Sequence, residues 1–293
     1  MKASVILATK DRGPAIGDTL DALLHLDFPA AEHEILLVDN CSSPHNRAHL
    51  QAFVTAHPDR TRYLREQKLG LSNARNCGIR HSRGNIIAFL DDDAIAPPHW
   101  LTNIVKAFNA DAQVYAVGGK VVAKFTTSPP EWIDLRLGGY IGNFDHGDLP
   151  KRLSYNDYPR GVNMAFRREA FERCGYFLDA FGRKGTSLMS YEDIEMCYRI
   201  DRAGYTVLYT PHAEIHHLIR GDRLNEAWFR KRFYWQGRSE GLFELLHFGR
   251  THVLKALSRH IALSVFDVDP YDQFYHRGFV TAIFLNFFRR KYE

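Results

Sequence analysis

The chain has 293 residues and a formal net charge of +4, and 45% of its residues are hydrophobic. This length and apolar content suffice for one large domain, or for one domain with an appendage. The net charge is too mild to indicate a nucleic-acid partner, and we expect none. The four cysteines form no C-x-x-C pair, which argues against a zinc site or a disulfide framework and fits a reducing compartment.

The sequence shows no targeting or membrane-spanning segment. The N-terminus lacks the regions of a signal peptide, and residues 4–8 are instead typical of a short strand. No apolar run approaches the roughly 20 residues that a bilayer-spanning helix needs. We therefore expect a cytoplasmic protein, with any membrane contact peripheral and on the inner face of the cell membrane.

The first third of the chain alternates apolar runs with segments of helical spacing. The runs typical of buried strands are residues 4–8, 34–38, 62–64 and 86–90. The segments with helical spacing are residues 16–24, 48–56 and 72–81. Near-continuous apolar strands that alternate with helices predict an α/β fold with a mainly parallel sheet covered on both faces.

The middle of the chain is less regular. Helices are expected at residues 99–109, 168–174 and 192–203, and strands at 114–123, 161–166, 206–209 and 213–217. Residues 124–160 have no clean period, and so long an irregular segment within a compact domain is usually functional or mobile. From Leu224 onward the pattern changes to long helices rich in aromatic and basic residues. We place a boundary near residue 221, which separates a domain 1–221 from a helical extension 222–293.

Three adjacent carboxylates, Asp91-Asp92-Asp93, follow the predicted strand 86–90. Open α/β sheets bind ligands outside the carboxyl ends of their strands. Adjacent carboxylates repel one another, so the triplet indicates a divalent cation shared with a phosphate-bearing substrate. The alternative is an acidic turn that caps the next helix, since Asp is a common N-cap residue.

Other polar groups stand at similar positions. Thr9-Lys10-Asp11-Arg12 and Asp39-Asn40 follow predicted strands, and Glu192-Asp193 precedes a helix. No G-x-G-x-x-G follows the first strand, and no G-x-x-x-x-G-K-[ST] occurs in the chain. These absences argue against a dinucleotide dehydrogenase and a P-loop kinase.

Six short motifs carry a resemblance to a known family. They are Ser4–Thr9, Leu37–Asn40, Gly70–Asn76, Phe89–Asp93, Asn163–Arg168 and Tyr191–Asp193. In this order, over about residues 3–220, they resemble a family 2 glycosyltransferase with the GT-A fold. The resemblance implies a central, mainly parallel mixed sheet flanked by helices. It also implies metal-dependent, inverting transfer of a sugar from a UDP- or dTDP-sugar to a hydroxyl of a glycan or lipid-linked acceptor, in surface polysaccharide or glycoconjugate biosynthesis.

The resemblance assigns residues to the nucleotide-sugar donor. They are Thr9, Asp11, Arg12, Asp39, Arg75, Asp91, Asp92 and Asn163. The carboxylate of Asp39 would accept from the N3–H of uracil or thymine, and its alternative role is that of a turn or helix-cap residue. Arg75 would contact the base or order the metal loop, and its alternative role is a structural ion pair with one of the aspartates.

The resemblance also implies a metal site formed by Asp91, Asp93 and His217. Strand alternation would point Asp92 away from this site. The ion would be Mn²⁺ or Mg²⁺, stabilising the charge that develops on the diphosphate leaving group. His216 is adjacent to His217, so either histidine could fill the ligand position.

Glu192-Asp193 matches the acidic pair that the family carries at a helix start. Asp193 would act as the general base that takes the proton from the acceptor hydroxyl. Glu192 would orient the acceptor. The alternative is that both acids only stabilise the helix N-terminus through its dipole.

The C-terminal segments Trp228–Trp235 and Phe279–Phe288, followed by Arg289-Arg290-Lys291, interleave or adjoin large apolar and basic side chains. Such segments can lie in a membrane interface. The alternative is that they pack on the catalytic domain or on a second subunit, as in a homodimer.

Two functions of other classes stay open at this point. One is a phosphoryl- or nucleotidyl-transferring enzyme with the same acidic metal site. The other is a non-catalytic nucleotide- or glycan-binding module. The separate Glu192-Asp193 pair argues against the first, and its presence together with Asp91-Asp92-Asp93 argues against the second.

Overall fold

In a computed structural model the chain is described over residues 1–288. It divides into two compact units: unit 1 contains Met1–Asp179 and Glu192–Ile219, and unit 2 contains Ala180–Tyr191 and the chain from Arg220 onward. Unit 2 thus includes a short segment that the sequence had placed in the first domain. The basic residues 289–291, which we associated with a membrane surface, lie outside the described residues.

The first half of the sheet in unit 1 is parallel. Its strands are β1 (Ala3–Thr9), β2 (His33–Asn40), β3 (Thr61–Glu66) and β4 (Ile86–Asp91), in the order β3-β2-β1-β4. β1, β2 and β4 are almost entirely buried, as expected for near-continuous apolar strands with helices on both faces. Their carboxyl ends therefore meet at one edge of the sheet, where the polar motifs follow.

The second half of the sheet is mixed. β8 (Asn163–Arg167) pairs antiparallel with both β4 and β6 (Val114–Phe125), and β6 pairs parallel with β9 (Thr206–Ile219). β5 (Ala94–Ile95) and β7 (Lys151–Leu153) pair antiparallel with β9. The mainly parallel character that we expected therefore belongs to the N-terminal half of the sheet.

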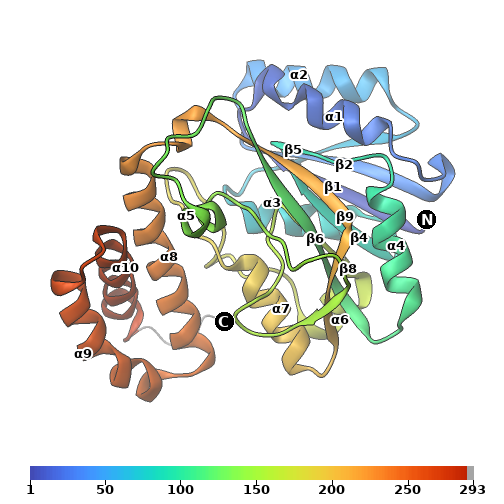
Figure 1. The fold of residues 1–293 in the computed structure, drawn as a ribbon. Coiled ribbons are helices and arrows are strands. Elements are labelled where there is room, and N and C mark those ends of the chain that lie inside the picture. Colours follow the sequence, from blue (N-terminus) through green and yellow to red (C-terminus); the bar gives the residue numbers. More distant parts are fainter. Residues whose placement is uncertain (289–293) are drawn as a thin grey trace. The chain divides into compact units, whose positions relative to one another are not determined.

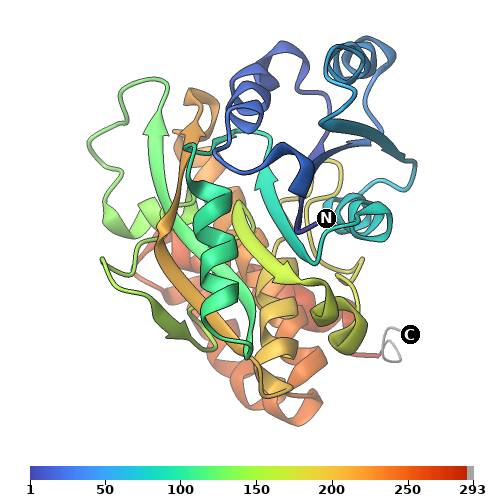
Figure 2. The same cartoon turned by 90° about the vertical axis from the view of Figure 1, so that its right-hand side faces the viewer.

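β9 is one strand where the sequence predicted two. Pro211 lies inside it, and the register with β6 shifts between Gly119 and Val121, so that residues 211–214 have no partner on β6. Proline has no N–H to donate, and a bulge accommodates it without breaking the strand. Figure 2 shows β9 curving along its length beside β6.

Helices cover both faces of the parallel half. The helices of unit 1 are α1 (Gly17–Leu24), α2 (Pro44–Ala56), α3 (Leu71–His81), α4 (Trp100–Ala110), α5 (Leu135–Tyr140), α6 (Arg168–Cys174) and α7 (Glu192–Arg202), with the 3₁₀ turns η1 (Gly13–Ile16) and η2 (Ala30–Glu32). Figure 1 shows α1 and α2 on the opposite side of β1 and β2 from α3. The predicted alternation of strands and helices is confirmed.

Unit 2 is helical. After η3 (Gly221–Arg223) come α8 (Glu226–His247), α9 (Arg250–Phe266) and α10 (Pro270–Asn286), which lie side by side (Figure 1). None of the helices within the described residues combines the length and hydropathy that crossing a membrane requires.

The backbones of α8 and α10 touch through glycines. A Cβ atom on Gly237 would lie 1.9 Å from the carbonyl oxygen of Tyr275, and one on Gly278 would lie 1.9 Å from that of Tyr234. Real Cβ atoms do not approach an oxygen so closely, so only glycine permits this helix crossing.

Part of the aromatic segment Trp228–Trp235 packs against another helix. Phe229 and Phe233 on α8 are buried, and both rings contact the ring of Tyr271 on α10. The packing alternative therefore holds for these two aromatics, because their side of α8 faces another helix.

Candidate active site

Arg12 pairs with two carboxylates of the acidic triplet. Its Nε lies 2.7 Å from Asp92 Oδ1, and a terminal guanidinium nitrogen lies 2.5 Å from Asp93 Oδ2. Thr9 donates its hydroxyl to Asp92 Oδ2 at 2.6 Å. β4 ends at Asp91, so strand alternation, on which we based the expectation that Asp92 points away from the metal site, does not extend to Asp92 and Asp93.

Burial and neighbouring charges both shift the pKa values of the side chains in this turn. Burial by itself lowers the pKa of Arg12, but the Asp92 and Asp93 carboxylates outweigh it and raise that pKa above its ordinary value. Burial also raises the pKa of Asp92, against the opposing effect of Arg12. The turn is thus a compact charged group in which one guanidinium offsets the mutual repulsion of two carboxylates.

His217 lies beside the triplet because of strand pairing. β5 follows Asp93 directly and pairs Ala94 with His217, while Leu218 donates its N–H to the Asp93 carbonyl at 2.8 Å. His217 Nε2 consequently lies 3.3 Å from Asp93 Oδ1. His216 points elsewhere, with its Nε2 3.2 Å from Glu214 Oε1.

A glycine from the irregular segment 124–160 closes this corner. A Cβ atom on Gly142 would lie 2.5 Å from His217 Nδ1, and its φ of +107° disfavours other residues as well. Gly142 could not be predicted from the sequence, because its role depends on a neighbour on a distant strand.

The donor set fits a divalent cation in part. Asp93 and His217 bring a carboxylate oxygen and an imidazole nitrogen together, the ligand types that Mn²⁺ and Mg²⁺ sites use. Asp91, the third predicted ligand, is instead paired with Arg75. Within residues 1–288 no group of three His, Cys, Asp or Glu side chains is arranged to hold a metal ion by itself.

Arg75 on α3 links the triplet to the acidic pair at the start of α7. One terminal nitrogen lies 2.8 Å from Glu192 Oε1, and the other lies 3.0 Å from Asp91 Oδ1 and 2.9 Å from the Gly161 carbonyl oxygen. Only 2% of its surface is exposed. Burial lowers the pKa of Arg75, but Asp91 and Glu192 outweigh this effect and raise it. The structure therefore shows the ion-pair role for Arg75.

The acids at the start of α7 differ in environment. Burial, reinforced by the neighbouring Asp193 carboxylate, raises the pKa of Glu192 to about 7. Its Oε1 contacts Arg75, whereas its buried Oε2 has no hydrogen-bond partner among the described residues. Asp193 is half-buried and accepts from the Gly161 N–H at 2.6 Å and from the Ile194 N–H at 2.9 Å. The second bond is the helix-start interaction that we had considered as an alternative.

The turns after β1 and β2 are joined to each other. Asp11, with a φ of +55°, accepts from the Ser43 N–H at 2.7 Å, and its own N–H donates to Ser42 Oγ at 3.0 Å. A hydrogen bond from Lys10 contributes most to lowering the pKa of Asp11. Asp11 is half-exposed at this edge, while Thr9 is buried beneath it.

Asp39 is fully buried and its carboxylate is engaged inside the protein. Oδ1 accepts from the Ser42 N–H at 2.8 Å, and Oδ2 accepts from the Tyr63 hydroxyl at 2.8 Å and lies 3.5 Å from Arg47 Nε. These contacts match the turn role that we held as the alternative to base recognition.

Asn163 requires a correction. Its side chain is buried, its amide donates to the carbonyl oxygens of Lys120 and Ala213, and its Oδ1 accepts from Trp100 Nε1. Both amide hydrogens are therefore donated to carbonyl oxygens of β6 and β9, and the side chain has none left to offer a donor sugar.

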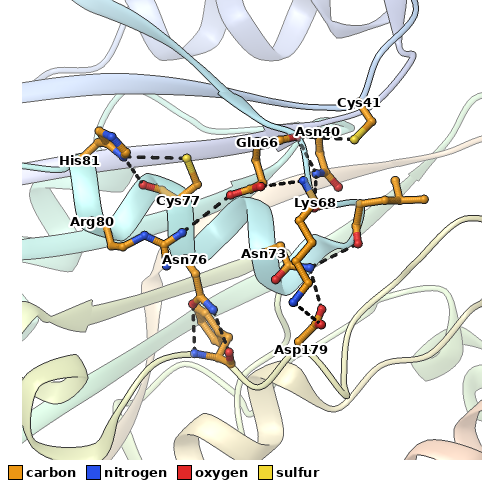
Figure 3. A network of polar contacts seen from close by, with 12 residues as sticks. Asn40, Cys41, Glu66, Lys68, Asn73, Asn76, Cys77, Arg80, His81 and Asp179 are labelled. Carbon is orange, nitrogen blue, oxygen red and sulfur yellow. Dashed lines mark hydrogen bonds and ion pairs between the residues drawn. The ribbon is translucent and has the colours of Figure 1, made fainter.

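An asparagine at the end of β2 holds the loop between β3 and α3 (Figure 3). Asn40 donates to the carbonyl oxygens of Glu66 and Lys68 and accepts from the Gly70 N–H. Its position directly after Asp39 was the one signal available.

Two further asparagines project from α3 toward a distant segment (Figure 3). Asn73 donates to Asp179 Oδ1 at 2.6 Å, and the Asn76 amide pairs with both the N–H and the C=O of Phe177. They lie three residues apart on one face of the helix, inside the Gly70–Asn76 motif. The Gly70–Asn76 motif thus carries Arg75 and also holds the backbone of the segment around Phe177 in place.

Comparison with known proteins identifies the family. The family model described as glycosyl transferase family 2 matches residues 4–175. The chain belongs to glycosyl transferase family 2. The chain is 26% identical over 250 residues to a glucosyl-dolichyl phosphate glucuronosyltransferase of Haloferax volcanii, covering 84% of this chain and 79% of that protein. A succinoglycan biosynthesis protein of Rhizobium meliloti is 28% identical over 238 residues, covering 78% of this chain and 71% of that protein.

A solved structure confirms the fold of this family 2 glycosyltransferase. A mannosyltransferase from Pyrobaculum calidifontis, in complex with GDP-Man and Mn²⁺, matches with a TM-score of 0.62 at 20% identity, covering 99% of this chain and 88% of that one. The predicted GT-A fold and glycosyltransferase activity are therefore confirmed. The family decides between sugar transfer and the phosphoryl-transfer and binding-module alternatives.

Proposed function

We propose that this glycosyltransferase moves a sugar from a UDP- or dTDP-sugar, with inversion, to a hydroxyl of a glycan or lipid-linked acceptor. The observation that supports this most is the position of Arg75. Its guanidinium contacts both Asp91, which we place on the side of the leaving group, and Glu192, which we place on the side of the acceptor. A single displacement at the anomeric carbon requires that the leaving group and the attacking hydroxyl be held in position at the same time. The setting would be surface polysaccharide or glycoconjugate biosynthesis, as the names of the two relatives suggest.

The cofactor of this reaction would be Mn²⁺ or Mg²⁺, held by Asp93 and His217, with Asp91 as a further ligand. The Mn²⁺ in the similar mannosyltransferase supports this choice. Such a cation acts as a Lewis acid that offsets charge on the departing diphosphate. Since only two of these side chains are in contact, we infer that diphosphate oxygens complete the coordination. Arg12 would balance the charge of Asp92 and Asp93 when the cation is absent.

Asp193 would be the general base. Its Oδ2 is oriented by the Gly161 N–H, and it would take the proton of the acceptor hydroxyl as that oxygen attacks the anomeric carbon. Attack from the face opposite the diphosphate inverts that carbon. Glu192, with a pKa of about 7, is only partly ionised at neutral pH and is therefore less suited to act as the base. Its Oε2, which has no partner among the described residues, would hydrogen-bond the acceptor instead.

Base recognition by Asp39 would require rearrangement of its turn. Its oxygens accept from Ser42 and Tyr63 inside the protein, and because Asp39 is fully buried a uracil or thymine N3–H could reach it only if the turn moved. A donor panel must therefore include GDP as well as UDP and dTDP, the more so because the similar mannosyltransferase holds GDP-Man.

The experiment is thermal unfolding with each nucleoside diphosphate, with and without Mn²⁺, followed by transfer assays with the matching sugars. We expect one nucleotide to stabilise the protein only when Mn²⁺ is present, by about 2.7 kcal/mol at one hundred times its dissociation constant. The variants Asp93→Asn and His217→Gln should weaken the metal-dependent part of this stabilisation. His216→Gln is the matched control, because His216 contacts Glu214 instead of the triplet. Absence of a response to any nucleotide with metal would contradict the proposal.

A further inference from the structure

The outer side of α9 carries an apolar stripe that nothing in the described structure covers. Leu254, Ile261 and Val265 are exposed and recur at helical spacing along it. The stripe ends in Phe266, which is 80% exposed, and in Val268 of the following loop, which is 97% exposed. Exposed apolar patches of this kind mark interaction surfaces. We refer to these five residues as the α9 face.

The charged residues of the helix that carries the α9 face are all basic. Arg250–Phe266 holds Arg250, Lys255 and Arg259 and no acidic residue, and all three cations are exposed. Arg277 of α10 adds a cation at the far end, where its Nε donates to the Ser264 carbonyl oxygen at 3.0 Å. Exposed apolar and cationic side chains thus share one helix.

The loop after α9 uses its carboxylates in local hydrogen bonds and an ion pair. Asp267 accepts from the Asp269 N–H through Oδ1, and its Oδ2 lies 3.3 Å from His276 Nε2. Asp269 caps α10 by accepting from the Tyr271 N–H at 2.7 Å. The two acids on either side of Val268 are therefore occupied in local bonds, and the tip of the loop presents an apolar side chain.

We propose that the α9 face lies on the anionic surface of a lipid bilayer. Phe266 and Val268 would enter the boundary between headgroups and acyl chains, and Lys255 and Arg259 would contact lipid phosphates. This surface lies in the C-terminal helical extension, as do the two segments that the sequence suggested, Trp228–Trp235 and Phe279–Phe288. The proposal concerns attachment and is independent of the donor and acceptor of the reaction.

Charge distinguishes a bilayer from a second copy of the chain. Two chains that met symmetrically through α9 would bring their cations together, since Arg250–Phe266 has no acid to pair with them. Anionic headgroups supply the missing negative charge, and they do so along the whole length of the helix. The charge of the α9 face is therefore complementary to an anionic bilayer and not to the same face of a second chain.

The test is co-sedimentation of the full chain with vesicles of phosphatidylcholine alone and of phosphatidylcholine with phosphatidylglycerol. We expect at least tenfold stronger partition into the anionic vesicles, and loss of most of it at high salt. The double variant Phe266→Ser/Val268→Ser and the double variant Lys255→Glu/Arg259→Glu should each reduce this partition by about tenfold or more. Both change exposed side chains, so folding should be preserved, as circular dichroism would verify.

Two matched controls belong to unit 1. Leu149→Ser removes an apolar side chain that is 77% exposed, nearly as much as Phe266. Lys106→Glu/Lys124→Glu makes the same change in net charge with two other exposed lysines. Both controls should bind vesicles like the unaltered chain. Equal binding to neutral and anionic vesicles, or undiminished binding by the α9 variants, would overturn the proposal. The proposal would also be overturned if the unaltered chain bound no vesicles and instead formed a dimer that the double variant Phe266→Ser/Val268→Ser no longer forms.

Discussion

Unit 1 gathers charged side chains in its interior, whereas unit 2 brings helix backbones into contact. In unit 1 the buried Arg75 holds Asp91 and Glu192 together. In unit 2, Gly237 of α8 and Gly278 of α10 each abut a carbonyl oxygen of the opposite helix. One region depends on matched charge and the other on matched shape.

This difference predicts how each region fails. A buried charge without its partner carries a large desolvation cost, so unit 1 should be sensitive to substitutions that change charge at constant volume. A close helix crossing has no room for added atoms, so unit 2 should be sensitive to a single methyl group. The four experiments below test this contrast.

The largest effect is expected for Asp193→Asn, which changes charge and almost nothing else. The amide oxygen can still accept from the Gly161 N–H, but it cannot take a proton. We expect kcat to fall by about 10²–10⁴-fold with the donor KM little changed, measured by release of the nucleoside diphosphate. Asp201→Asn on the same helix, where Asp201 accepts from the Tyr158 hydroxyl, is the control. Near-full turnover of Asp193→Asn would remove this residue from the role of base.

Arg75→Met should lower the free energy of unfolding by about 3–5 kcal/mol, because it leaves the carboxylates of Asp91 and Glu192 without their cation. The measurement is urea denaturation followed by circular dichroism. Arg80→Met, on the same helix, removes an exposed guanidinium 3.7 Å from Glu66 and should cost less than about 1 kcal/mol. Similar losses for the two variants would show that burial of the ion pair is not what matters.

Gly278→Ala should destabilise unit 2 by about 1–3 kcal/mol, since the new Cβ would overlap the Tyr234 carbonyl oxygen and force α8 and α10 apart. The same denaturation experiment measures it. Gly17→Ala in α1, where a Cβ would meet nothing within 4 Å, should have no cost or a small stabilising effect. If both variants were neutral, the close contact between α8 and α10 would not contribute to stability.

The smallest effect is a pH dependence that arises from Glu192. Its pKa is about 7 in the folded protein against an ordinary value of 4.5, so the folded state holds the proton more tightly. The corresponding stability is complete below pH 4.5 and is lost as the pH rises through about 7. Relative to Glu192→Gln, the unaltered chain should therefore lose about 1–2 kcal/mol between about pH 6 and about pH 8, as thermal unfolding at several pH values would measure. Parallel stability curves for the two proteins would contradict the assignment.

The order and type of most elements in unit 1 could be predicted from the sequence. Apolar runs of four or five residues marked β1, β2 and β4, since a strand buried on both faces must be apolar throughout. The interior of β9 escaped prediction, because Pro211 reads as a break unless the bulge against β6 is known.

The structure brings some of the predicted site residues together and engages others inside the fold. Asp93 and His217 were expected to lie together, and they do. Asp39 and Asn163 stand in the right motifs, yet both side chains are engaged inside the fold. A motif identifies which residue occupies a strand end, but the partner of its side chain comes from other elements.

By itself, the sequence determined the family, the alternation of strands and helices, and the acidic positions at the strand ends, because these depend on residues close together in the chain. Only the tertiary structure decided that Arg75 pairs with Glu192, 117 positions away, and that Gly237 and Gly278 let two helices touch. The physical reason is that periodicity reports which face of an element is buried. What it is buried against depends on contacts closed by folding of the whole chain.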